Sequence, residues 1–263
     1  MVGNNLDLLP GGYSQVEGVD YDKLFSPIVH YETVRVLLAL AALEDWELEA
    51  LDVKTAFLYG KLDEEIYMEQ PEGFVKDSSK VWRLRRSLYG LKQAGLSWWR
   101  ACTKLMTQDL GFKRCTSDAG IYVYKENNKT IIAIIYIDDA LFMGNDKELV
   151  MCKKREFMQC WECRDLGAAQ EFLGMHIRRD RSKWRLTLDQ SEYLKKIIKR
   201  FKLTNAKVAQ TPLPTRYQPS KYDGPVDPKR CQEYQQVIGS LLYLSLGTRA
   251  NIAYHVAKTS QHQ

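Results

Sequence analysis

Three aspartates stand where this sequence could bind a divalent cation. Asp52 lies at the end of the apolar stretch 47–53, and Asp138 and Asp139 form a tight turn that we expect between two very hydrophobic strands. Charges at the ends of buried strands are unfavourable unless something compensates them. Carboxylates that converge from two strands also repel one another, and a hard cation relieves that repulsion. The pattern therefore indicates a Mg²⁺ site of the kind that serves phosphoryl transfer.

A simpler explanation of these acids is structural. Aspartate is common in turns because it caps and bends the chain, and an isolated Asp-Asp turn would most often mean no more than that. The turn here stands in the context Tyr136-Ile137-Asp138-Asp139 between apolar strands, and a second acidic motif contains Asp52. Both features favour the metal site.

The elements that would position these acids are helices and strands without a regular alternation. We therefore predict an α+β fold with an antiparallel sheet. The hydrophobic periodicity and the turn residues predict these elements. The expected strands are 47–53, 66–68, 121–125, 130–137, 140–144, and a hairpin of 172–177 with 184–188; the expected helices are 32–43, 88–110, 146–161, 189–201 with an Asp189/Glu192 capping box, and a final helix 234–246. Residues 211–227 hold four of the eight prolines and are expected to be a linker.

Composition narrows the class of protein. The chain has 263 residues, 45% hydrophobic, which suffices for one large domain or two smaller ones. The net charge of +5 is modest, but residues 178–207 hold eleven Lys and Arg against three acids. This local excess favours a phosphate-contacting surface, with a solvated charged face as the alternative. Cys160 and Cys163 form a C-x-x-C pair, but no second pair or His partner lies at zinc-ligand spacing, so we expect reduced thiols in an intracellular protein. We also expect no membrane association, because no segment looks like a membrane span or signal peptide.

Six blocks of the sequence resemble copia-type reverse transcriptases, in that family's order. They span about residues 12 to 258, and six blocks in order are far more specific than any one of them. The blocks are 12–29, the Asp52 block 51–60 with 66–74, 88–94, the Tyr-x-Asp-Asp block 136–139, 172–177 and 239–244.

The resemblance implies the right-hand polymerase fold, with a palm of antiparallel sheet and helices on one face, truncated fingers, a small thumb and the start of a connection segment. It implies that 1–11 is a non-family, disordered start, that 12–170 holds partial fingers and palm, and that 171–210 holds a primer-grip hairpin and thumb. Residues 211–263 would be a linker and connection toward a ribonuclease H domain. The chain would belong to a larger Pol polyprotein with integrase and ribonuclease H, located in the cytoplasm, in virus-like particles, or in the nucleus.

The resemblance also assigns roles to residues. It implies RNA-directed DNA synthesis by two-metal nucleotidyl transfer from a deoxynucleoside triphosphate to a primer 3′-hydroxyl on an RNA or DNA template, with two Mg²⁺ ions, or Mn²⁺ in their place. The implied catalytic and metal-binding residues are Asp52, Asp138 and Asp139. The implied nucleotide-binding residues are Val53, Lys54, Thr55, Ala56, Phe57, Tyr89 and Gly90, with the Phe57 ring excluding a 2′-hydroxyl. The implied primer and template contacts are Lys92, Gln93, Tyr136, Gly174, Met175, His176, Lys195 and Lys199.

Two other functions stay open at this point. Residues 1–11 contain no Lys or Arg where the family has a basic fingers segment, and Gly95 stands where Pro is frequent. These departures favour an impaired or domesticated remnant that at most binds nucleic acid. A non-polymerase nucleotidyltransferase is disfavoured by the primer-grip and thumb-like blocks.

Overall fold

The computed structural model describes residues 15–75, 77, 79–214, 224–225 and 227–261. The chain divides into two compact units, 1–169 and 170–263, and each is described by itself. The expected start 1–11 and most of the expected linker 211–227 fall outside the described residues. The mixture of helices with antiparallel sheets confirms the α+β class.

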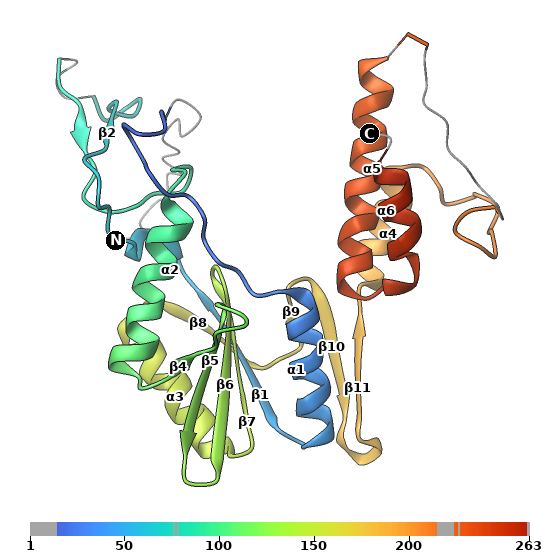
Figure 1. Ribbon diagram of the computed structural model, residues 1–263, viewed down its shortest axis with the longest axis horizontal. Helices are drawn as coiled ribbons and strands as arrows, with labels where there is room; N and C mark the ends of the chain where they lie inside the picture. The colour runs from blue at the N-terminus through green and yellow to red at the C-terminus, as the bar shows by residue number, and fades with distance from the viewer. Residues whose placement is uncertain (1–14, 76, 78, 215–223, 226, 262–263) are drawn as a thin grey trace. The chain divides into compact units, whose positions relative to one another are not determined.

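The first unit is built on a six-stranded antiparallel sheet in the order β4-β5-β6-β7-β1-β8 (Figure 1). Its strands are β1 (Glu47–Val53), β4 (Lys113–Arg114), β5 (Ile121–Glu126), β6 (Lys129–Tyr136), β7 (Asp139–Gly144) and β8 (Cys163–Ala168). The short strands β2 (Tyr67–Met68) and β3 (Trp82–Arg83) pair separately. Its helices are α1 (Tyr31–Leu43), the 3₁₀-helix η2 (Ala56–Tyr59), α2 (Ala94–Lys104), the π-helix η3 (Leu105–Asp109) and α3 (Lys147–Cys160).

One face of this sheet is buried by α2 and α3. Leu51 and Val53 of β1 share a core cluster with Trp98 of α2 and Phe157 of α3. Successive side chains of a strand point to opposite faces, so Asp52, between these two residues, points to the other face. The end of β1 thus places Asp52 on the face opposite the core cluster that contains Leu51 and Val53.

The second unit combines a small sheet with helices. The sheet has the order β11-β10-β9, from β9 (Glu171–Phe172), β10 (Met175–Asp180) and β11 (Arg185–Asp189), with the 3₁₀-helix η4 (Arg181–Lys183) between the last two. The helices are α4 (Ser191–Arg200), α5 (Pro228–Gly247), the 3₁₀-helix η5 (Ala250–Ile252) and α6 (Ala253–Ser260). Helices α5 and α6 pack against each other. Every helix among the described residues is too short or too polar to cross a lipid bilayer.

Several predicted boundaries are wrong. The expected helix 88–110 begins only at Ala94, because the chain turns at Gly90, whose φ is +99°, and it ends as a π-helix. The helix expected to begin at Asp189 begins at Ser191, because Asp189 still pairs with His176 in the sheet. The final helix is longer than predicted, and α6 was not predicted at all.

Two turns also differ from expectation. Residues 172–177 do not form one strand, because Leu173 and Gly174, both with positive φ, make a two-residue turn between β9 and β10. The turn of the acidic hairpin consists of Ile137 and Asp138, and Asp139 is already the first residue of β7.

Candidate active site at the ends of β1, β6 and β7

Two of the three predicted acids face each other across neighbouring strands. In the antiparallel pair of β1 and β7, Asp52 is the direct partner of Asp139. Directly opposed residues have Cα atoms about 4.5 to 5.5 Å apart and side chains on the same face. Tyr136 pairs with Asp139 from the other side. These three side chains therefore share the sheet face opposite α2 and α3.

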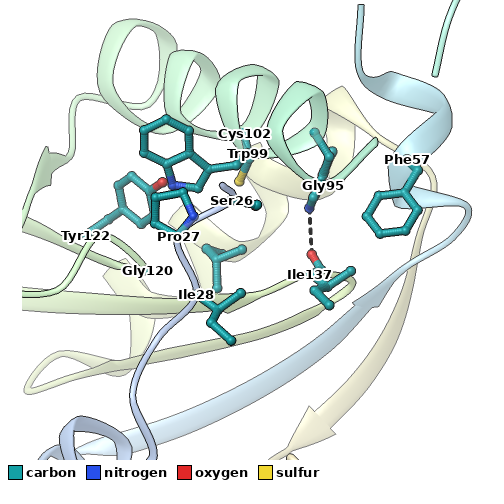
Figure 2. Close-up of a pocket in the computed structure, with 12 residues that line it drawn as sticks. Ser26, Pro27, Ile28, Phe57, Gly95, Trp99, Cys102, Gly120, Tyr122 and Ile137 are labelled. Carbon is teal, nitrogen blue, oxygen red and sulfur yellow. Dashed lines mark hydrogen bonds between the residues drawn. The ribbon is translucent and has the colours of Figure 1, made fainter. Parts of the chain in front are cut away.

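The third acid, Asp138, is held beside them by its turn. Ile137 has a φ of +55°, which is rare for a β-branched residue. Two tertiary hydrogen bonds fix the turn: the Trp98 indole Nε1–H donates to the Ile137 carbonyl at 2.7 Å, and the Val53 N–H donates to the Asp138 carbonyl at 2.7 Å. Figure 2 draws the first bond as a dashed line at Ile137. The turn is thus tied both to α2 and to the strand that carries Asp52.

The carboxylates sense one another electrostatically. Partial burial raises the pKa of Asp138; a hydrogen bond from its own backbone lowers it, and the negative charge of Asp52 raises it further. Within the described residues, no three His, Cys, Asp or Glu side chains stand close enough together to form a ready-made metal site. Mg²⁺ in proteins commonly takes only one or two carboxylates and completes its octahedron with water and substrate phosphates. The opposed carboxylates of Asp52 and Asp139, with Asp138 beside them, could supply the one or two carboxylates that such a cation needs.

The side chains of residues 53–57, which follow Asp52, differ in how exposed they are. Val53 and Ala56 are buried in the helix-side core. Thr55 has a left-handed backbone and precedes η2. Lys54, which the resemblance assigns to nucleotide binding, places its Nζ 2.6 Å from a carboxylate oxygen of Glu162. Any use of Lys54 by a ligand would have to compete with that exposed ion pair.

Phe57 and Tyr89 form an aromatic pair near the acids. Their ring centroids lie 4.6 Å apart. Burial raises the pKa of the Tyr89 hydroxyl, and the charges of Asp138 and Asp52 add to the rise, whereas hydrogen bonds with the backbone of Ala56 and Phe57 oppose it. The Tyr89 hydroxyl therefore lies close enough to η2 and to both acids to be affected by them.

A cavity of about 90 Å³ lies behind the hairpin turn (Figure 2). Its wall is mostly apolar and includes Ile137 from the turn, Phe57 from η2 and Cys102 from α2. Sequence reasoning did not find this cavity, because its lining comes from segments that are far apart in the chain. Phe57 therefore connects the cavity with the aromatic pair.

Lys92 and Gln93, predicted as template contacts, are used within the protein. The Gln93 side chain is buried, donates to the Asp20 carbonyl at 3.0 Å and accepts from the Gln15 amide at 2.9 Å. The Lys92 Nζ donates to the Gln15 carbonyl at 3.0 Å and to the Tyr21 hydroxyl at 3.2 Å. The structure gives both side chains a role in holding the segment 15–21.

The predicted primer contacts of the second unit lie around the β9–β10 turn and on α4. Gly174 is in the turn, Met175 is fully buried, and His176 is half-buried with its Nδ1 3.9 Å from Glu171. Lys195 and Lys199 are exposed on α4. The buried Met175 side chain leaves only its backbone available to a ligand.

A polar groove of about 430 Å³ lies beside His176. Its lining residues are Gln170, His176, Ile177, Arg178, Asp189, Ser191 and Glu192. Sequence reasoning also missed Tyr243 of α5, whose hydroxyl donates to the Leu173 carbonyl at 2.9 Å. No local signal could reveal that contact, which spans seventy positions of the chain.

Comparison with known proteins shows the class to which this chain belongs. Residues 6–215 match the family described as reverse transcriptase (RNA-dependent DNA polymerase). Since this match spans most of the chain, the protein belongs to the reverse transcriptase family, and the predicted resemblance is confirmed.

The relatives are transposon proteins of the copia type. The chain is 41% identical to the retrovirus-related Pol polyprotein from transposon TNT 1-94 of Nicotiana tabacum, over 97% of this chain and 20% of the relative. It is 34% identical to the Pol polyprotein from transposon RE1 of Arabidopsis thaliana, over 97% of this chain and 17% of the relative. It is 32% identical to a protein of transposon Ty5-1 from Saccharomyces cerevisiae, over 80% of this chain and 68% of the relative. The chain thus spans about a fifth of the tobacco polyprotein.

Proposed function

We propose that this chain performs RNA-directed DNA synthesis at the site of Asp52, Asp138 and Asp139. The observation that carries the proposal is the direct opposition of Asp52 and Asp139 on the sheet face away from the helices. Membership of the reverse transcriptase family supports the reaction class. In this proposal the sheet around β1, β6 and β7 is the palm, and the second unit supplies the thumb and connection.

The acidic site fits a pair of Mg²⁺ ions, with Mn²⁺ as a substitute. Bound there, the ions would supply charge neutralisation at the primer 3′-hydroxyl and at the triphosphate. Asp52 and Asp139 orient their carboxylates to one face because their strands are in register. Asp138 keeps its place because Val53 and Trp98 hold the turn from two sides. The protein's contribution is therefore a fixed arrangement of negative charge.

Phe57 and Tyr89 define the proposed sugar pocket. The Phe57 ring lies five residues after Asp52 and packs against the Tyr89 ring. A bulky ring beside the sugar leaves no room for a 2′-hydroxyl, and the pair would therefore select deoxynucleotides. Gly90, with its φ of +99°, lets the chain turn away directly after Tyr89.

The proposed primer and template surface lies on the second unit. It combines the Gly174–His176 segment with the exposed Lys195 and Lys199. Such a surface would contact phosphates, and its affinity would fall with salt. Integrase and ribonuclease H would act as other parts of the same polyprotein, because the relatives are Pol polyproteins of which the chain covers a fifth or less.

Primer extension tests the proposal. The purified chain is given an RNA template, a DNA primer, the four deoxynucleotides and Mg²⁺, and it is compared with Asp52→Asn and with Asp109→Asn, which changes an exposed acid outside the site. We expect template-directed extension by the wild-type chain and by Asp109→Asn, and none by Asp52→Asn. Equal extension by Asp52→Asn would contradict the proposed site. Binding of primer–template by a wild-type chain that extends nothing would favour the remnant alternative.

A further inference from the structure

The β9–β10 turn in the second unit has a backbone that its own sequence does not favour. Leu173 has a φ of +51° and Gly174 a φ of +69°. Phe172 pairs with Met175, so these two residues alone make the turn. Glycine adopts this region readily, whereas leucine does not. Something outside the hairpin must therefore hold Leu173 in place.

Tyr243 of α5 supplies that hold. Its hydroxyl donates to the Leu173 carbonyl at 2.9 Å. A Cβ placed on Gly174 would lie 2.2 Å from the same hydroxyl oxygen, so the helix closes tightly over the turn. The Tyr243 ring packs edge-on against Tyr193 of α4, with centroids 4.7 Å apart. Tyr243 of α5 thus contacts both the β9–β10 turn and helix α4.

We propose that Tyr243 is a positioning residue for the primer terminus. Its hydroxyl fixes the Leu173–Gly174 turn so that the backbone of Gly174 and Met175, and the half-buried His176, keep the conformation that contacts the primer. The inference rests on the proposed function, because it presumes that this turn meets a primer. It also gives α5, which the sequence suggests is only a connector, a part in substrate binding.

A purely structural role of Tyr243 predicts different nucleic-acid affinities from a positioning role. If Tyr243 only stabilised the second unit, its loss would weaken binding to every nucleic acid alike. If it positions the turn, its loss should weaken binding to a recessed primer end more than binding to a closed duplex. The ratio of the two affinities is therefore the readout that separates the two roles.

The test uses the full chain with Tyr243→Phe, which keeps the ring against Tyr193 and removes only the hydroxyl. Tyr234→Phe is a matched control, because Tyr234 lies on the same helix and its hydroxyl donates to the Thr259 carbonyl at 2.8 Å. Dissociation constants are measured by fluorescence anisotropy for a recessed primer–template and for a closed dumbbell duplex of equal length. Amide hydrogen exchange of residues 172–177 is followed in parallel.

We expect Tyr243→Phe to reduce the preference for the recessed end about 2- to 10-fold, as the loss of one hydrogen bond implies. Exchange at 172–177 should be faster, and Tyr234→Phe should change neither quantity. Unchanged preference and unchanged exchange in Tyr243→Phe would overturn the proposal. So would an equal loss of affinity for both duplexes.

A double variant sharpens the test. Gly174→Ala alone should weaken recessed-end binding, because the new methyl group meets the Tyr243 hydroxyl. In the Tyr243→Phe background the new Cβ at position 174 lies 3.5 Å from the nearest ring atom, which is an ordinary contact. Gly174→Ala should therefore weaken binding less in that background than in the wild-type chain. If the loss of affinity in the double variant equals the product of the losses in the two single variants, the contact between position 174 and the Tyr243 hydroxyl has no role in binding.

The outcomes also separate this inference from the proposed function. A wild-type chain that binds neither duplex would overturn both. A wild-type chain that prefers the recessed end, together with a Tyr243→Phe variant of the same preference, would overturn only the positioning role.

Discussion

Asp52 of β1 lies directly opposite Asp139 of β7, one residue beyond the two-residue turn that carries Asp138. The register places the two carboxylates on the sheet face that α2 and α3 leave free. Negative charge on Asp52 raises the pKa of Asp138, so the acids are close enough to disturb one another. This arrangement is unfavourable for the metal-free fold and favourable for a cation, which is the basis of the first prediction.

Asp138→Asn should abolish RNA-templated extension, by at least about 100-fold, without unfolding the chain. Burial and then Asp52 raise the Asp138 pKa, which means that the folded state penalises the ionised carboxylate above that pKa. Asparagine removes this penalty at neutral pH. The melting temperature in EDTA at pH 7 should therefore be unchanged or higher. A lower melting temperature together with lost activity would indicate that Asp138 supports the fold instead.

Phe57→Val should relax the selection against ribonucleotides. Opening the space beside the Tyr89 ring would admit a 2′-hydroxyl, and we expect the ratio of deoxy- to ribonucleotide kcat/KM to fall about 10- to 100-fold. Steady-state single-nucleotide incorporation measures the ratio. Phe74→Val, at an exposed phenylalanine outside the site, is the control and should leave it unchanged. An unaltered ratio in Phe57→Val would contradict the proposed role of Phe57 in excluding the 2′-hydroxyl.

The sequence predicts the acidic hairpin well, and its failures have physical causes. The run of isoleucines before Asp138 and the Asn127-Asn128 turn predict β5 and β6 almost to the residue. The turn itself was misplaced by one residue, because Ile137 is a poor residue for a positive φ. Hydrogen bonds from Trp98 and Val53 hold the turn in place, and no local sequence pattern predicts them.

Other features depended on contacts between distant segments. The helix predicted from 88 begins at Ala94, and the preceding Gln93 side chain instead binds Gln15 and Asp20. The contact of Tyr243 with Leu173 likewise joins parts of the chain that sequence periodicity treats separately. The acidic motifs, supported by the family resemblance, located the candidate acids, whereas the side chains that support them come from distant parts of the sequence.

Lys154→Met should destabilise the first unit by about 3 to 5 kcal/mol. The Lys154 ammonium is 1% exposed and lies 2.8 Å from Glu49 and 2.5 Å from Asp165. Its removal leaves the largely buried Glu49 carboxylate without its partner. Urea unfolding measures the loss.

Two further variants check the cause. Replacing both partners, Lys154→Met with Glu49→Leu, should recover much of the loss, because no unpaired charge stays buried. Lys147→Met, on the exposed side of the same helix, should change the free energy of unfolding by less than about 0.5 kcal/mol. A double variant less stable than Lys154→Met would contradict this explanation.

Asp118 should contribute an acid-sensitive part of the stability. Burial alone would raise its pKa, but hydrogen bonds from the His30 backbone, Thr33 and Gly120 lower it overall. A lowered pKa in the folded state stabilises the fold above the unfolded value, about 3.9, and this contribution is lost as the pH falls through the folded pKa. Asp118→Asn should therefore be less stable than wild type at pH 7, and the difference should shrink at pH 3. Urea midpoints at the two pH values measure this, and a constant difference would contradict it.

Counting bound Mn²⁺ by electron paramagnetic resonance shows whether the opposed aspartates hold metal ions, because it needs no turnover. The chain is saturated with a dideoxy-terminated primer on an RNA template and the next deoxynucleotide, and wild type is compared with Asp139→Asn and Asp109→Asn. We expect tight Mn²⁺ binding in wild type and in Asp109→Asn, and the loss of at least one ion in Asp139→Asn, because we propose that Asp139 and its strand partner Asp52 hold the metal. The same number of ions, bound equally tightly in all three proteins, would show that the opposed aspartates do not hold the metal.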